Sequence, residues 1–271
     1  MLFPRLIRAG FLRYSTYRQA TLAGLTTNVV FGLLRTAVLL AVLAERGTAD
    51  ARGPAEAGPA TVGGYDAAAA VTYVWLGQGL LTVVLLWGDV ELSRRIRSGD
   101  VVVDLGRPWD LQAARLAGDL GRAGFAVLTR LVPPAAFGAL LFGLRWPEHP
   151  GTYALFAVSV LAAVVVSFAI RFLLNLTAFW LLDARGVLAV WGVVGGLLAG
   201  LVMPLSWFPP WARTALWWTP FPALFQTPID VFLEQVSWPA VIHQVAWMVL
   251  LLAAGRVALE RGARRLVVQG G

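Results

Sequence analysis

The chain has 271 residues, of which 58% are hydrophobic and 14% are charged, and its mean hydropathy is +0.71. A soluble domain usually contains about 25% charged residues, so this composition excludes an ordinary soluble enzyme and a disordered chain. The absence of cysteine excludes disulfides, thiolate metal sites and cysteine nucleophiles. All 22 basic residues are arginines and the net charge is +7, which in so apolar a chain indicates membrane topology rather than nucleic-acid binding.

The hydrophobic segments predict an all-α integral membrane protein with six transmembrane helices. Residues 3–20 are arginine-rich and amphipathic, which is typical of a helix lying on the membrane surface. The first two spans are predicted at 22–44 and 68–88, since about 20 apolar residues cross the hydrocarbon layer. The polar stretch between them, rich in glycine and proline, is predicted to be a flexible external loop.

Residues 89–121 are too polar to cross a membrane. Asp110 is placed to cap a new amphipathic helix from Leu111 to Leu120, because its carboxylate can accept from the free N–H groups of the first turn. The residues alone favour two interpretations equally: a docking surface for a partner, or a solvated connection. Spans three and four are predicted at 122–144 and 153–182, and the second of these is long enough to be tilted.

The last third of the chain contains two further predicted spans, at 187–205 and 240–259. The intervening segment, 206–239, is apolar but has six prolines, which prevent one straight helix. Short helices at the membrane surface, or helices that enter and return, fit this pattern, and the five tryptophans suit the interface.

Arginine positions predict the orientation of the chain. Fifteen of the 22 arginines fall on one side of this layout and four on the other, while Arg35, Arg130 and Arg171 fall inside spans. Basic residues collect in cytoplasmic loops, so both termini are predicted to be cytoplasmic.

No catalytic motif is present. A phosphate-binding loop of the P-loop type needs a lysine, and this chain has none, so we expect no enzymatic activity and ATP bound only by another chain. His149 and His243 are far apart and lack acidic neighbours at metal-ligand spacing, so no metal site is predicted.

The arginines inside spans are costly, at about 2.5–3.5 kcal/mol each on insertion scales. No acidic residue is predicted at mid-span to pair with them. They can extend to the membrane surface, which fits Arg130 and Arg171 best, bond backbone carbonyls, or line a hydrated path. A further hypothesis is that they attract an anionic group of a substrate. On span five, Gly192, Gly196 and Gly200 are four residues apart, so one face of the helix has no side chains. This face can pack closely against a helix of this chain or of a second chain.

Two motifs resemble ABC-2 type permeases of bacteria. RRIRSGDVVVDLGRPWD is similar to the stretch that follows span two in one bacterial branch, where Ser-Gly-Asp precedes a Leu-x-Arg-Pro turn. MPLSWFPPWARTALWWTPFPALFQTPIDVFLE is similar to the stretch between spans five and six. With the six-span layout, the resemblance extends over essentially the whole chain.

The resemblance implies a permease subunit of an ATP-binding-cassette exporter in the bacterial cell membrane. Its expected partners are separate ATPase subunits, which bind ATP and magnesium, a second permease that is identical or a sister chain, and membrane lipid, with no nucleic acid. A coupling element at about 91–106, within the cytoplasmic region 89–121, would enter a groove on the ATPase, with polar contacts from Glu91, Arg94, Arg95, Arg97 and Asp100. The segment 206–239 would form an external re-entrant cap. Side chains of spans two and five would border the substrate path: Trp75, Gln78, Thr82 and Trp191.

Two alternatives remain at this stage. One is a membrane anchor or assembly scaffold without transport. The other is an ion-coupled secondary transporter, which usually needs acidic groups at mid-membrane, and the sequence predicts none.

Overall fold

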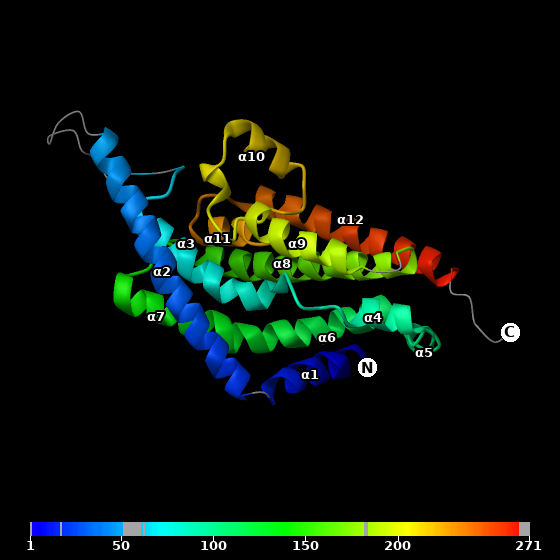
Figure 1. The fold of residues 1–271 in the computed structure, drawn as a ribbon. Coiled ribbons are helices and arrows are strands. Elements are labelled where there is room, and N and C mark those ends of the chain that lie inside the picture. The colour runs from blue at the N-terminus through cyan, green and yellow to red at the C-terminus, as the bar shows by residue number, and fades with distance from the viewer. Residues whose placement is uncertain (1, 17, 51–60, 62, 182–183, 266–271) are drawn as a thin grey trace.

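The computed structural model describes residues 2–16, 18–50, 61, 63–181 and 184–265, and over this part of the chain it is helical with no strand (Figure 1). The α-helices are α1 (Leu2–Ser15), α2 (Arg18–Asp50), α3 (Ala67–Leu80), α4 (Glu91–Ser98), α5 (Val101–Leu105), α6 (Leu111–Ala126), α7 (Val132–Phe142), α8 (Pro150–Leu176), α9 (Arg185–Leu198), α10 (Pro210–Trp217), α11 (Gln226–Phe232) and α12 (Trp238–Ala263). Two π-helical turns, η1 (Leu81–Leu85) and η2 (Val127–Leu131), extend α3 and join α6 to α7. The predicted all-α class is confirmed.

Five helical stretches of the described residues are long and apolar enough to cross a membrane. They are Thr21–Glu45, Ala67–Leu85, Leu111–Phe142, Pro150–Phe179 and Trp238–Ala263. The predicted fifth span, 187–205, contains only α9, whose 14 residues extend about 21 Å against a hydrocarbon layer of about 30 Å. The segment predicted as a cap contains two short helices, α10 and α11, as its prolines indicate.

Two predicted helices have other bounds in the structure. Asp110 caps a helix that begins at Leu111, with a 2.7 Å bond from the Ala113 N–H, so the predicted cap is confirmed. The predicted helix from Leu111 to Leu120 and most of the predicted span 122–144 form one continuous helical stretch, Leu111–Phe142. The predicted helix 3–20 ends at Ser15, and Arg18 already belongs to α2.

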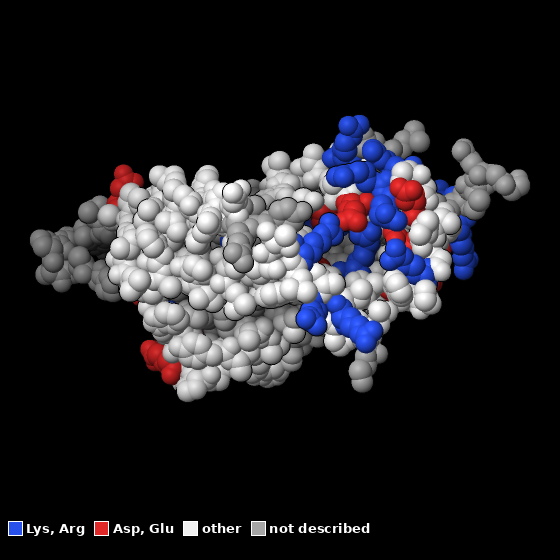
Figure 2. Space-filling view, turned by 90° about the horizontal axis from the view of Figure 1, so that it is seen from below, with Lys and Arg blue, Asp and Glu red and all other residues white. Residues whose placement is uncertain are grey.

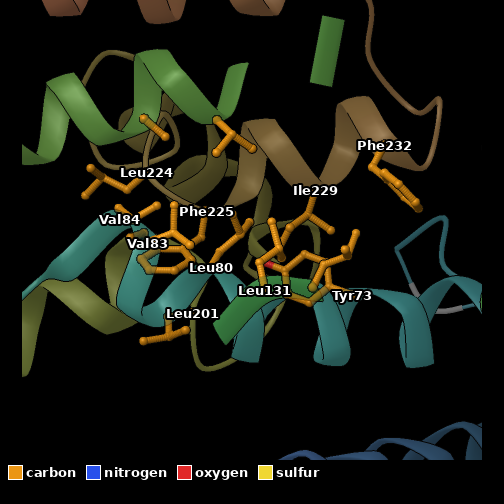
Figure 3. Packing of buried hydrophobic residues seen from close by; sticks show 14 of the residues in the cluster. Tyr73, Leu80, Val83, Val84, Leu131, Leu201, Leu224, Phe225, Ile229 and Phe232 are labelled. Atoms are coloured by element: carbon orange, nitrogen blue, oxygen red, sulfur yellow. The ribbon is translucent and has the colours of Figure 1, made fainter. Parts of the chain in front are cut away.

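The largest hydrophobic core lies between α3, α8 and the segment predicted as a cap. Leu80 and Val83 from span two pack with Leu224, Phe225 and Ile229 of that segment (Figure 3). Since these side chains are buried, α11 is an integral part of the bundle rather than a detached cover. Along the rest of its length α8 packs against α12.

The two ends of the bundle differ in charge. We call the end that carries α4, α5, the start of α1 and the end of α12 the charged end, and the opposite end, which carries α7, the cap end (Figure 1). Seen from the side of α1, arginine and acidic side chains gather over the charged end, while most of the remaining surface is uncharged (Figure 2).

Glycines allow α1 to lie unusually close to α6. A Cβ atom at Gly121 would overlap the Ile7 carbonyl and lie 2.7 Å from the Phe11 nitrogen, and one at Gly10 would overlap the Gly118 carbonyl. Because backbone atoms cannot give way as a flexible side chain can, the contact requires hydrogen at these positions. Phe11 then stacks edge-on against Phe125, with ring centroids 5.5 Å apart.

We predict that Gly121→Ala loosens α1. Overpacking of this kind costs about 1–3 kcal/mol. The thermal midpoint of the detergent-purified protein should fall, and trypsin should cleave faster at Arg8 and Arg13. Gly124→Ala is the matched control, because its Cβ would meet only the Phe11 ring at 3.9 Å. Equal stability and cleavage in the two variants would contradict the close packing.

Candidate functional site

Span two ends in an irregular segment, residues 81–90, which we call the span-two junction. It begins as the π-helical turn Leu81–Leu85 and then leaves helical geometry, with Leu85 at φ +50° and Gly88 at φ +90°. Positive φ is strained for leucine and unstrained for glycine. This path separates the axis of span two from that of α4, which begins at Glu91.

Side chains from three other helices bind the carbonyl groups that the junction leaves without helical partners. Arg122 of α6, only 3% exposed, donates to Thr82 O at 2.5 Å and to Val83 O at 2.9 Å. Three further donors act on this segment: Ser167 Oγ on Leu85 O at 2.8 Å, Trp191 Nε1 on Leu86 O at 2.9 Å, and Asn175 Nδ2 on Asp89 O at 2.7 Å. A buried carbonyl without a partner costs about 1–3 kcal/mol, so these bonds make the break in the helix tolerable.

A chain of buried ion pairs continues from Arg122. Asp119 lies 2.6 Å from Arg122 and 2.7 Å from Arg171, and the Arg171 guanidinium lies 2.8 Å from Asp89. We call these four residues the charge relay. It connects α6, α8 and the junction, and its two positive and two negative groups balance. The expectation that Arg171 extends to the membrane surface is wrong, since it is 2% exposed and has two acidic partners.

Beyond the junction, α4 and α5 form a short helical hairpin. Arg95 holds it together, donating to Asp104 at 2.6 Å and to Asp100 O at 3.2 Å, and the hydrogen bond with Asp104 raises the pKa of Arg95. The hairpin is also attached to α8, because the Ser93 N–H donates to Asn175 Oδ1 at 2.9 Å. Its tip exposes Val103, which is 62% accessible.

The residues predicted to contact an ATPase therefore differ in role within this chain. Arg95 is an internal brace of the hairpin. Arg94, Arg97 and Asp100 are exposed, and Asp100 accepts from Ser98. Glu91 faces Arg13 of α1 at 3.8 Å.

The predicted path residues do not share one site. Trp75 is fully buried against Gly32 and Gly138. Gln78 and Arg35 line a groove of about 610 Å³ between α2 and α3, where Arg35 donates to the carbonyls of Leu201 and Val202.

Three more of these candidates lie at other places. Thr82 and Arg130 line a small cavity of about 140 Å³ near α1, and the Arg130 guanidinium lies over Gly24 of α2. Trp191 stacks on Phe221, with centroids 5.8 Å apart.

The glycine face predicted on span five is partly wrong. Gly200 lies beyond the end of α9, at φ +86°, so it is not on that helix. Gly192 and Gly196 both face Trp87 of the junction, whose Nε1 donates to Gly192 O at 2.6 Å. These two glycines thus pack within this chain.

A second buried polar cluster lies towards the cap end. Tyr65 donates to Asp230, Gln226 donates to Asp230 at 2.7 Å, and the Tyr73 hydroxyl bonds to both Gly200 O and Gln226 Oε1. This cap network connects the start of span two, α11 and the chain after α9.

Sequence reasoning missed the acidic members of both clusters. Asp119 and Arg122 are three residues apart on one helix face, and this signal was available once the helix was known to begin at Leu111. Asp230 and Tyr65 are 165 residues apart, and no local pattern brings them together.

We predict that Asp119→Asn is strongly destabilising, by about 3–5 kcal/mol, because it leaves two buried guanidinium groups without their shared counter-ion. Thermal or denaturant unfolding of the purified protein checks this. Glu260→Gln is the control, since it removes a carboxylate of an exposed pair with Arg256. An Asp119 variant as stable as this control would contradict the charge relay.

The cap network predicts a pH-dependent stability. Burial raises the pKa of Asp230 from 3.8 to about 6, although bonds from Tyr65 and Gln226 oppose the shift. The folded state therefore binds this proton more tightly than the unfolded chain, and stability should rise as the pH falls from about 7 to about 4. Asp230→Asn should be more stable than the native protein by about 1–3 kcal/mol near pH 8, and this difference should shrink as the pH falls and vanish below about pH 4. A difference that does not vary with pH would contradict this.

Comparison with known proteins gives the family of the chain. A family model described as ABC-2 family transporter protein matches residues 59–270, which include α3 to α12, the span-two junction and the charge relay. Comparisons with curated proteins and with solved structures found no match. Together with the membrane-spanning helices, the match shows that the chain belongs to the ABC-2 transporter family of multi-pass membrane proteins.

Proposed function

We propose that this chain is the permease subunit of an ATP-binding-cassette exporter in a bacterial cell membrane. Family membership supports a membrane subunit, and a chain without lysine has no P-loop of its own. ATP and Mg²⁺ are then bound by separate ATPase subunits, and a second permease, identical or a sister chain, completes the transporter.

The proposed topology has six spans and both termini in the cytoplasm. In this arrangement the charged end faces the cytoplasm, as the arginine distribution favours, and α10 and α11 belong to the external side. The fifth crossing combines α9 with the non-helical residues that follow it, whose carbonyls at 201 and 202 are bound by Arg35. Irregular backbone at such depth is tolerated where protein side chains satisfy it.

The observation that supports coupling best is the attachment of the α4–α5 hairpin to three spans at once. The hairpin follows Asp89 directly, and Asp89 is bound to Arg171 of α8, which shares Asp119 with Arg122 of α6. A displacement of the hairpin by a closing ATPase would therefore act on the ends of spans two, three and four together. In this proposal the movement reorients the spans and gives alternating access.

The exposed side chains of the hairpin are the proposed docking surface for the ATPase. They include Val102 and Val103 on α5 and Arg94 on α4. Contact surfaces between proteins combine an apolar core with an enrichment in arginine.

Co-purification from the native membrane tests this proposal. The tagged chain should retain an ATPase in stoichiometric amount, and Val103→Glu and Arg94→Glu should each lose it while their thermal midpoints stay unchanged. Arg95→Glu should in addition lower the midpoint, because Arg95 braces the hairpin. Arg261→Glu, at the end of α12, is the control and should retain the ATPase.

The result also separates a permease from a non-transporting scaffold. The proposed docking would be contradicted if no ATPase is recovered with the native chain, or if recovery is undiminished with both Val103→Glu and Arg94→Glu.

A further inference from the structure

A cavity of about 390 Å³ lies at the charged end between α1, α4, α6 and α8. Figure 2 shows a hollow bordered by basic and acidic side chains at this end. Its basic wall includes Arg13 of α1 and Arg115 of α6, and its apolar wall includes Phe168 and Phe172 of α8. The volume lies within the range of about 300–1,000 Å³ that small-molecule sites occupy.

Most acidic groups at this cavity are already neutralised within the charge relay. Asp119 is bound to Arg122 and Arg171, and Asp89 is bound to Arg171. Glu91 is the remaining acidic group of the lining, and it faces Arg13 at 3.8 Å. The relay therefore adds no net charge to the cavity.

Arg13 and Arg115 are held only loosely. Both lie 3.8 Å from their carboxylates, which is beyond hydrogen-bonding distance. The carboxylate near Arg115 belongs to Asp104, which already accepts a 2.6 Å bond from Arg95. The Arg115 Nε–H is buried and has no hydrogen-bond partner among the described residues. Such a donor costs free energy until an acceptor arrives.

The surface beside the cavity indicates an amphiphile rather than a free ion. Beside the cavity, α1 has no buried residue and exposes Leu2, Phe3 and Leu12, as a helix embedded in the membrane surface does. The cavity is thus placed at the level of lipid headgroups.

We propose that this cavity binds the phosphate of an anionic phospholipid, with the guanidinium N–H groups of Arg13 and Arg115 as donors. Arginine binds phosphate oxygens by charge-assisted hydrogen bonds, which are stronger than neutral ones. The lipid would fix α1 to the hairpin base, beside Glu91. The proposed topology determines only which membrane leaflet supplies the lipid. Binding of the lipid does not depend on whether the chain transports a substrate.

Native mass spectrometry and thermal shift of the detergent-solubilised full chain test it, with phosphatidylglycerol, phosphatidylcholine and inorganic phosphate as probes. The test variant is Arg13→Gln with Arg115→Gln. The matched control is Arg5→Gln with Arg8→Gln, which removes the same charge from exposed positions of α1 outside the cavity. Arg13→Gln alone serves as a second variant, because its side chain is 72% exposed and the fold does not depend on it.

We expect saturable binding of phosphatidylglycerol, weakened about tenfold or more by the double variant, several-fold by Arg13→Gln and within about twofold by the control. Equal weakening by test and control would reduce the effect to general surface charge and overturn the site. Equal affinity for phosphatidylcholine would also overturn it. Stabilisation by inorganic phosphate equal to that by the lipid would overturn the assignment to a phospholipid.

Discussion

The fold depends on how the broken end of span two is satisfied. Within a membrane, an interrupted helix is stable only if other groups bind the carbonyls that lose their helical partners. Arg122 binds two of them, and side chains of α8 and α9 bind three more. The same arginine needs a counter-ion, Asp119, which in turn holds Arg171 and through it Asp89. One constraint therefore determines both the turn of the chain into α4 and the attachment of α4 to three spans.

Much of the helical framework follows from local sequence signals. Apolar length predicted the regions of five of the six proposed spans, the prolines predicted short helices between residues 206 and 239, and Asp110 identified a helix start through its cap. The continuity of the helix from Leu111 into the third span was not predicted, because charged residues at 115, 119 and 122 suggested a separate exposed segment. They stay inside a continuous helix since Arg122 and Asp119 neutralise each other and the partner on α8.

The candidate site was much less predictable. The motif after span two identified the hairpin, but its internal brace by Arg95 and its attachment through Asn175 depend on contacts between distant segments. Within its own span, Arg171 has no acidic partner, so the sequence suggested an isolated cation. Its two partners lie on a neighbouring helix and in the junction. The three glycines were predicted to lie on one helix face, but α9 ends before Gly200, and Gly192 and Gly196 pack against the Trp87 side chain. Non-local pairing of this kind has no periodic signature in the sequence.

The central claim is that the hairpin moves the spans through the charge relay. The chain has no native cysteine, so spin labels can be placed at Ser98→Cys on the hairpin, outside the named docking residues, and Leu140→Cys at the far end of span three, both exposed. Electron spin resonance of the complex reconstituted with its ATPase measures the distance between them. The account predicts a change on ATP binding in the native background and a much smaller one with Asp89→Asn, at equal ATPase occupancy. An unchanged response in the Asp89 variant would contradict transmission through the relay.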